Sequence, residues 1–234
     1  MFDSRDWPTP KPIGILKARD PAVDLALRTQ ARRDAIRCSG VTQTYTELIF
    51  KNTADYTAFN TSTAEGSILG GTNEQPVIPA FAMWANNTAG KVFQIRAKGV
   101  LGTTSTPTII FQVRLGTTIG SSFLSGASLG VSAAITTQSG VSNKFWELDF
   151  DMVCYTPGLG SGNGTLSGAG KVLSPGGFAS PFAYALEPTT PDTATWTQTF
   201  DPSVTQYLNL SATWSASSSS NTITCKYLEV ILKN

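Results

Sequence analysis

The sequence predicts a mainly β protein: an antiparallel, jelly-roll-like β-sandwich preceded by an extended N-terminal arm and one short α-helix. Two observations lead to this prediction. Only 14% of the 234 residues are charged, against roughly 25% in an ordinary soluble domain, and Ser, Thr, Gly and Asn replace the missing charge. After Gly40, short alternating runs are separated by Gly, Ser, Asn and Pro clusters, which indicates roughly eight to ten short strands.

The chain divides by composition into residues 1–40, an arm and helix for assembly or attachment, and residues 41–234, the sandwich domain. Residues 1–40 contain eight Lys/Arg and five Asp/Glu, so this segment has a net charge of about +3 and the remainder about −2. The low overall charge favours an oligomer, because a free monomer relies on surface charge for solubility.

The arm contains three closely spaced prolines, which favour an extended chain over a packed helix. These prolines are Pro8, Pro10 and Pro12. Its apolar side chains are candidates for docking on a neighbouring subunit, namely Trp7, Ile13 and Ile15.

One helix is expected from Asp20-Pro21, where an N-cap precedes proline at the first helical position, to the region before Gly40. Its narrow apolar stripe lies either on its own domain or against a partner subunit. The candidate partner-binding residues of the helix are Arg28, Arg32, Arg33 and Arg37. Nucleic acid is not the expected partner, because Asp24 and Asp34 interrupt the basic residues.

The first strands are expected at Thr44–Phe50 and at Val77–Trp84, where Pro79 requires an edge position or a bulge. Strict alternation then predicts strands around residues 93–98 and 109–115, joined by a loop at Gly102–Pro107. We expect these two strands to be antiparallel neighbours with one face in the core.

Residues 116–143 are rich in Gly, Ser and Thr and hold one or two weak strands. Residues 146–154 form the longest alternating face of the chain, so this strand should lie centrally in a sheet. Gly158–Gly177 is either a long exposed loop or a flexible hairpin around Thr165–Leu173.

The last two strands are expected at 208–214 and 222–232, with a polar turn at Ser215–Asn221. In the last strand, Ile223 and Cys225 share one parity, whereas Leu228, Val230 and Leu232 share the other. The switch at Lys226-Tyr227 predicts a β-bulge, because one extra residue resets which face points inward.

Catalytic chemistry is sparse in this sequence. The chain has no histidine, which excludes Ser-His-Asp and Cys-His hydrolases, and we expect neither an enzyme nor a cofactor. Cys38, Cys154 and Cys225 are too widely spaced for a metal motif and are expected to be buried free thiols. The glycine-rich Gly158–Gly164 stretch lacks the Lys-Ser/Thr pair of a phosphate loop.

Three carboxylates, Glu147, Asp149 and Asp151, share the polar face of one predicted strand. They form a solvated face, bind Ca²⁺, or supply an acid and base for glycoside cleavage, and the first alternative is favoured. Four tryptophans lie on or near predicted strands, Trp84, Trp146, Trp196 and Trp214. They are expected in the core, with Trp196 the best candidate for an exposed exception.

Neither membrane insertion nor export is expected. No apolar run approaches the roughly 18 residues needed to cross a bilayer, and residues 1–17 lack the apolar core of a signal peptide.

Four segments resemble virion proteins of tailed bacteriophages. They are FQIRAKG (93–99), TIIFQVRLGTT (108–118), WELDF (146–150) and LNLSATWSASSSSNTITC (208–225). They are similar to those proteins in order and spacing, and the likeness covers roughly residues 77–234.

The resemblance implies a jelly-roll-like module that decorates or cements a capsid, or forms a head or tail fibre, usually as a trimer. The leading hypothesis is therefore a capsid decoration protein, a homotrimer that contacts the major capsid protein or other virion proteins on the particle surface. The alternative is a head or tail fibre module that binds host surface glycans. An enzyme acting on polysaccharide is the third option, supported only by the carboxylate face.

Overall fold

The computed structural model describes residues 46–70, 75–80, 91–118, 126–158, 164–188 and 196–233. The chain divides into two units, Met1–Thr44 and Tyr45–Asn234, and the described residues belong to the second. The predicted arm and helix, with Trp7, Ile13, Ile15 and the four helix arginines, lie outside the described residues.

The second unit is built from antiparallel β-strands, which confirms the predicted fold class. Within the described ranges there are thirteen strands, of which β2, β3, β7 and β11 have only two or three residues. They are β1 (Thr46–Asn52), β2 (Gly66–Ser67), β3 (Val77–Ile78), β4 (Lys91–Gly102), β5 (Thr108–Gly116), β6 (Ala127–Ser132), β7 (Ile135–Thr136), β8 (Lys144–Thr156), β9 (Gly164–Leu173), β10 (Ala183–Glu187), β11 (Gln198–Phe200), β12 (Gln206–Trp214) and β13 (Thr222–Lys233).

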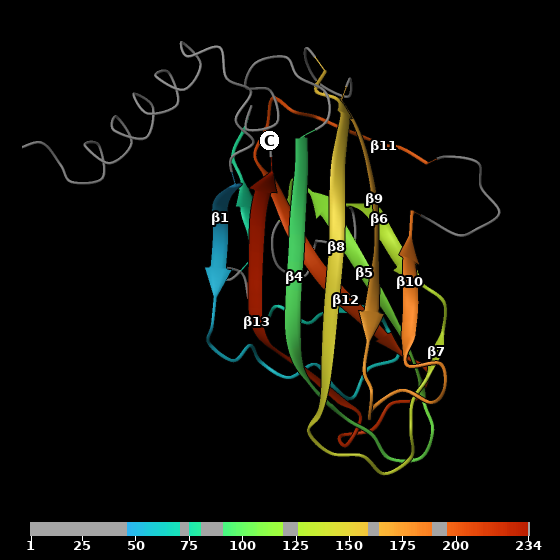
Figure 1. The fold of residues 1–234 in the computed structure, drawn as a ribbon. Helices are drawn as coiled ribbons and strands as arrows, with labels where there is room; N and C mark the ends of the chain where they lie inside the picture. Colours follow the sequence, from blue (N-terminus) through green and yellow to red (C-terminus); the bar gives the residue numbers. More distant parts are fainter. Residues whose placement is uncertain are drawn as a thin grey trace, which may run out of the picture. The chain divides into compact units, whose positions relative to one another are not determined.

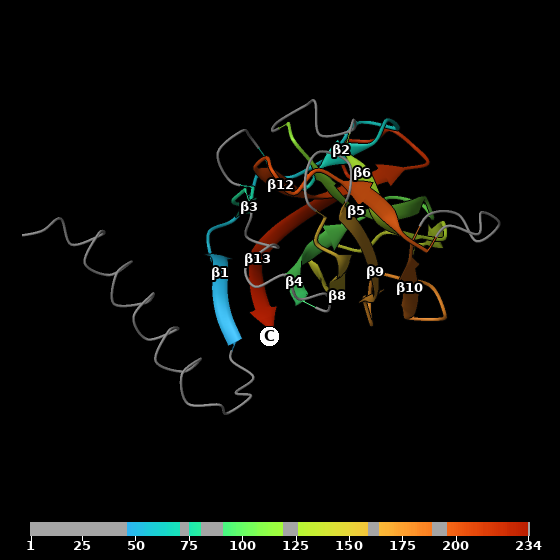
Figure 2. The same cartoon turned by 90° about the horizontal axis from the view of Figure 1, so that it is seen from above.

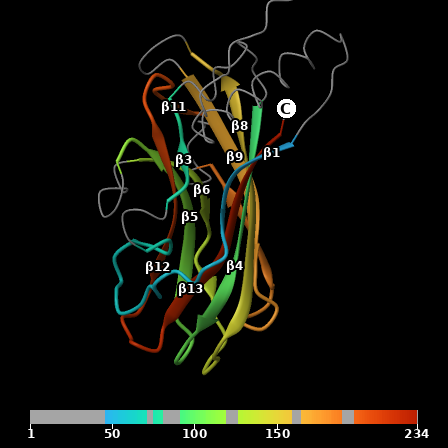
Figure 3. The same cartoon turned by 90° about the vertical axis from the view of Figure 1, so that its left-hand side faces the viewer.

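The strands form two layers that face each other across the core (Figures 1 and 3). One layer has the order β1-β13-β4-β8-β9, and the other has the order β6-β5-β12, with β2 and β3 paired to β12. Strand β10 pairs with both β9 and β6, so it joins the layers along one side. Seen from above, the first layer curves around the second (Figure 2).

The prediction that β4 and β5 are neighbours is wrong. Strand β4 pairs with β13 and β8, whereas β5 pairs with β12, β6 and β7. The loop between them was correctly expected, but it carries the chain from one layer to the other. The buried face of each strand was also correctly predicted, since alternation reports the face and does not report the partner. Strand β4 pairs with β13 in one layer, and β5 pairs with β12 in the other. This arrangement of paired strands in two layers resembles a jelly roll.

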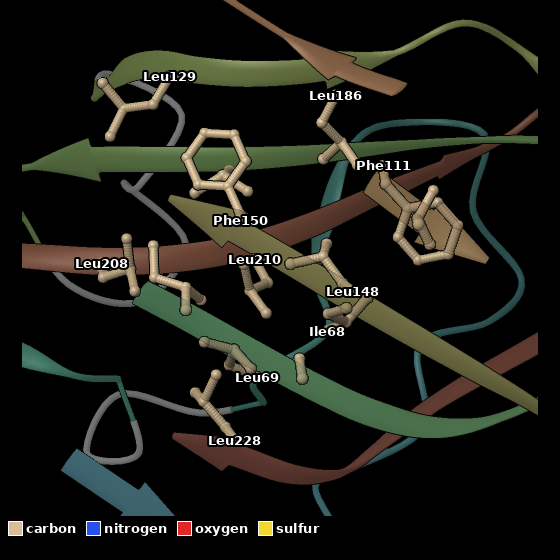
Figure 4. Close-up of a cluster of buried hydrophobic side chains, with 14 of the residues drawn as sticks. Ile68, Leu69, Phe111, Leu129, Leu148, Phe150, Leu186, Leu208, Leu210 and Leu228 are labelled. Atoms are coloured by element: carbon tan, nitrogen blue, oxygen red, sulfur yellow. The ribbon is translucent and has the colours of Figure 1, made fainter. Parts of the chain in front are cut away.

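Residues 53–70 close the edge of the sandwich between β13 and β12. The Tyr56 N–H donates to the Cys225 carbonyl (2.9 Å), Phe59 forms a bridge with Ile223, and the Ile68 N–H donates to the Leu210 carbonyl (2.9 Å). The segment thus bonds first to one layer and then to the other. The side chains of Ile68 and Leu69 are fully buried in the core (Figure 4).

The long strand β8 lies between β4 and β9, as expected from its alternation. Its inward residues, Trp146, Leu148, Phe150 and Met152, are completely buried. The last strand contains the predicted bulge, because the register against β4 shifts between Cys225 and Tyr227. Leu228, Val230 and Leu232 consequently point inward together with Ile223 and Cys225.

Of the two alternatives for Gly158–Gly177, the hairpin is confirmed, since Gly164–Leu173 is the ten-residue strand β9, which pairs with β8. Residues 159–163 lie outside the described residues. Gly168 and Gly170 face Phe150 of β8, and Gly164 faces Phe200 of β11, so small residues here make room for bulky neighbours. Of the run Val77–Trp84, only Val77–Ile78 is a strand in the described part, at the edge beside β12, and residues 81–84 lie outside it.

Candidate functional site

The outer face of the β1-β13-β4-β8-β9 layer carries a set of charged side chains that we call the charged face. Because the inward residues of β4, β8 and β13 are buried apolar side chains, the residues between them point outward. Five bases and four acids make up the charged face: Lys51, Arg96, Lys98, Lys171 and Lys233, and Glu147, Asp149, Asp151 and Glu229.

The charges alternate in sign across the strands. The strand registers align one row of five residues, Lys51, Glu229, Arg96, Asp149 and Lys171, on five successive strands. Opposite charges on neighbouring strands attract, whereas like charges there would destabilise the sheet. Because the charges alternate, the row of charged side chains does not destabilise the sheet.

The ion pairs of the charged face are loose. The Lys98 Nζ lies 3.2 Å from a Glu147 oxygen, and the Arg96 Nε and Nη1 lie 3.9 Å and 3.6 Å from Asp149 and Glu229. The Lys233 Nζ lies 3.7 Å from Asp151. Apart from Glu229, which is 15% exposed, the side chains of these pairs are 30–49% exposed. Pairs this exposed contribute only about 0–1 kcal/mol each, so they hold the side chains weakly.

An open, shallow hollow of about 390 Å³ lies in the middle of this face. Arg96 and Lys98 line it together with Glu147, Asp149, Tyr227 and Glu229. The Tyr227 hydroxyl donates a hydrogen bond to Glu229, and this bond raises the pKa of Tyr227 because it stabilises the protonated phenol. The Nζ of Lys51 lies 5.7 Å from the centre of the Tyr227 ring.

The three carboxylates singled out in the sequence all lie on the charged face, and each faces a polar or basic side chain of β4 or β13. Asp149 also accepts a hydrogen bond from the Gln94 side-chain nitrogen (3.1 Å). No group of three or more Asp, Glu, Cys or His residues in the described part is arranged to hold a metal ion. The pairing with basic and polar side chains is compatible with the solvated-face interpretation, which stays a prediction.

A different arrangement holds an ion pair on the outer side of the second layer. Arg114 on β5 donates two hydrogen bonds to Glu65, at 2.7 Å and 2.8 Å, and the Ser211 hydroxyl donates to the same carboxylate. Both charged side chains are largely buried, with exposed fractions of 16% and 14%. This bidentate pair fastens residues 53–70 to β5 and β12.

The tryptophans and cysteines of the described residues lie where the sequence predicted them. Trp146 and Trp214 are buried in the core, whereas Trp196 is 70% exposed, as expected. Cys154 and Cys225 are buried free thiols, and burial raises the pKa of Cys225 to about 12. Trp84 and Cys38 lie outside the described ranges.

The sequence reasoning missed Arg96, Lys98, Tyr227 and Glu229 as parts of one site. Arg96 and Lys98 alternate with apolar residues in β4, which places them on an outer face. Their proximity to β13 depends on a pairing between strands about 130 residues apart in the chain, for which alternation carries no signal.

Comparison with known proteins gives little further information. No protein-family model and no curated protein matches the chain. Among solved structures, the CBM2 module of the evolved Dit of Lactobacillus casei BL23 phage J-1 aligns with 82% of this chain and 98% of its own, at 13% identity and a TM-score of 0.32. In the part of the chain that the structure describes, no helix is long and apolar enough to cross a membrane.

Proposed function

We propose that the protein is a non-enzymatic structural protein of a bacteriophage particle, and that it acts as a capsid decoration protein. In this proposal the sandwich packs as a homotrimer on the capsid surface, and residues 1–40 attach it to the major capsid protein or to a neighbour. The protein is made in the host cytoplasm and resides on the particle.

The observation that carries the proposal is the agreement between the resemblance and the fold. The four segments that resemble phage virion proteins correspond to β4, β5, β8 and the β12–β13 turn region. Their inward residues make up much of the core. The likeness thus concerns the framework of the sandwich, which is the part that a decoration module and a fibre module share.

The charged face supports an assembly role over catalysis. It is a sheet surface with balanced charge and a shallow hollow, and its acids are opposed by bases on the neighbouring strands. Such a surface suits contact with a ligand or protein, since a catalytic acid and base usually require a more enclosed, water-poor site.

The test uses particles assembled from a genome in which this gene is deleted. Added protein should bind the mature heads, and the decorated heads should resist heat better than bare ones. Heads that fail to bind the protein, with equal heat stability in its presence and absence, would contradict the decoration role. Immunogold label on the tail of complete particles would instead support the fibre alternative.

A further inference from the structure

Two arginine–carboxylate arrangements in this protein differ sharply. Arg114 is locked by two short hydrogen bonds to Glu65 and is 16% exposed. Arg96 is 41% exposed, and its contacts with Asp149 and Glu229, at 3.9 Å and 3.6 Å, exceed hydrogen-bonding length. Among the described residues, the guanidinium of Arg96 therefore retains donors that a ligand can use.

Two acidic side chains of the hollow are also accessible, whereas Glu229 is only 15% exposed and accepts from the Tyr227 hydroxyl. Asp149 is 37% exposed, and its one hydrogen bond, from Gln94, occupies a single oxygen. Glu147 is 30% exposed and faces Lys98. A carboxylate offers about four acceptor positions, so these groups accept further hydrogen bonds without leaving their partners.

The charge of the hollow selects the class of ligand. Two bases and three acids line it, so an anion bound at Arg96 would lie against Asp149 and Glu229. A cation bound at the acids would lie against Arg96 and Lys98. Like charges in contact with each other repel. The hollow therefore disfavours both an anionic and a cationic ligand.

A neutral ligand with adjacent hydroxyl groups meets neither repulsion. Each hydroxyl both donates and accepts a hydrogen bond, so one of a pair accepts from the Arg96 guanidinium while the other donates to Asp149. The Tyr227 ring also lines the hollow and adds an amphipathic surface of the kind enriched at binding sites. We propose that the hollow around Arg96 on the charged face binds a neutral saccharide.

The saccharide site goes beyond the proposed function, because it does not depend on where on the particle the protein is located. If the decoration role fails, the saccharide site is still tested by the experiment below. If the saccharide site fails, the decoration role is unaffected.

The experiment measures binding of the full chain to five hexasaccharides by titration calorimetry. Three are neutral, namely maltohexaose, cellohexaose and N-acetylchitohexaose. One is acidic, hexagalacturonate, and one is basic, the hexamer of glucosamine. We expect saturable binding of at least one neutral hexamer, and binding of both charged hexamers weaker by about tenfold or more.

Two conservative variants test the assigned groups. Arg96→Lys keeps the positive charge and loses the planar fork, and Asp149→Asn keeps the shape and loses the charge. Each should weaken binding of the neutral hexamer by about tenfold or more, because Arg96→Lys loses the fixed donor directions of the guanidinium and Asp149→Asn loses the charge that strengthens the hydrogen bond to a hydroxyl. Glu187→Gln, a matched change on the exposed side of β10 away from the hollow, should leave the affinity unchanged.

Unchanged thermal unfolding of the three variants serves as the check on folding, and Arg96→Gln replaces Arg96→Lys if that variant is unstable. The proposal is overturned if none of the neutral hexamers binds, or if a charged hexamer binds more tightly than the neutral ones. It is also overturned if folded Arg96 and Asp149 variants retain the wild-type affinity.

Discussion

The packing around Phe150 shows how single residues shape this fold. Its ring lies in the core between the two layers (Figure 4), where it faces two glycines on different strands. A Cβ at Gly168 on β9 would lie 2.2 Å from the ring, and a Cβ at Gly130 on β6 would lie 2.3 Å from it. Both distances are far below van der Waals contact, so the ring occupies the space of two absent side chains.

Gly168→Ala should therefore destabilise the protein by about 1–3 kcal/mol, because an added methyl group overpacks the core. Urea denaturation of the purified variant measures the loss. Gly176→Ala is the control: its φ is not in the left-handed region and its Cβ would meet only the flexible Lys144 side chain, at 3.3 Å, so it should change the stability by less than about 0.5 kcal/mol.

A second substitution separates packing from strand effects. If the ring causes the clash, Phe150→Leu in the Gly168→Ala background should cost less than Phe150→Leu alone, because the two changes share one space. Strictly additive losses would contradict this explanation.

The buried thiols link stability to pH. Burial raises the pKa of Cys225 from 9.0 to about 12, and burial also raises the pKa of Cys154. Between pH 9 and pH 12, Cys225 has lost its proton in the unfolded chain and still holds it in the folded chain. A rise in pH therefore favours unfolding, and the stability from this group is complete below pH 9 and declines above it.

We expect the free energy of unfolding to fall between pH 9 and pH 12, with Cys225 contributing up to about 1.4 kcal/mol per pH unit. Cys225→Ala should flatten this decline and leave the part due to Cys154. Chemical denaturation of both proteins across this range measures the two slopes. Equal slopes would show that Cys225 remains protonated, or is equally titrated, in both states.

At the scale of the element, β13 depends on its bulge. The extra residue, Lys226, lies between Cys225 opposite Gly99 and Tyr227 opposite Lys98. Its side chain is half-exposed and contacts Asp55. The bulge is thus the point at which the inward parity of the strand changes.

Deletion of Lys226 should leave a protein that folds and unfolds cooperatively, because it removes the bulge and keeps Leu228, Val230 and Leu232 inward. Deletion of Glu229 is the matched comparison. It moves Val230 and Leu232 to the outer face and brings Ile231 and Lys233 inward, so about one buried aliphatic side chain is lost, at a cost of about 1.5–3 kcal/mol. Circular dichroism with urea denaturation distinguishes the two, and similar losses would contradict the assigned parity.

The pairing partners of β4 and β5 were the part of the sheet that the sequence predicted wrongly. In β4 and β5, alternation correctly marked Phe93, Ile95, Phe111 and Val113 as inward residues. A short loop between two alternating strands is compatible with a hairpin and with a crossing between layers. The choice depends on β12 and β13, which lie about 100 residues later in the chain and insert as the neighbours of β5 and β4.

At the scale of the whole molecule, the second unit contains a self-sufficient core. The buried apolar cluster extends from Tyr56 to Leu232, and residues 53–70 close the side at which β12 and β13 would otherwise leave it open. A compact unit with its own core is expected to fold alone.

A chain that begins at Tyr45 should therefore fold, with cooperative thermal unfolding and a free energy of unfolding within about 1 kcal/mol of that of the full chain. Calorimetry of both proteins makes the comparison. A shortened chain that lost its cooperative transition would show that residues before Tyr45 complete the core. Under the decoration hypothesis, the shortened protein should also fail to bind heads.

The sequence by itself determined the fold class, the inward face of the long strands, the central position of β8, the bulge in β13 and the exposure of Trp196. These features depend on local alternation and turn chemistry, which neighbouring residues encode. Tertiary structure alone decided which strands pair, that Gly164–Leu173 is a core strand, and that Arg96, Asp149, Tyr227 and Glu229 surround one hollow. Long-range pairing brings these residues together, and the burial of two whole sheet faces, a property of the complete sandwich, decides that pairing.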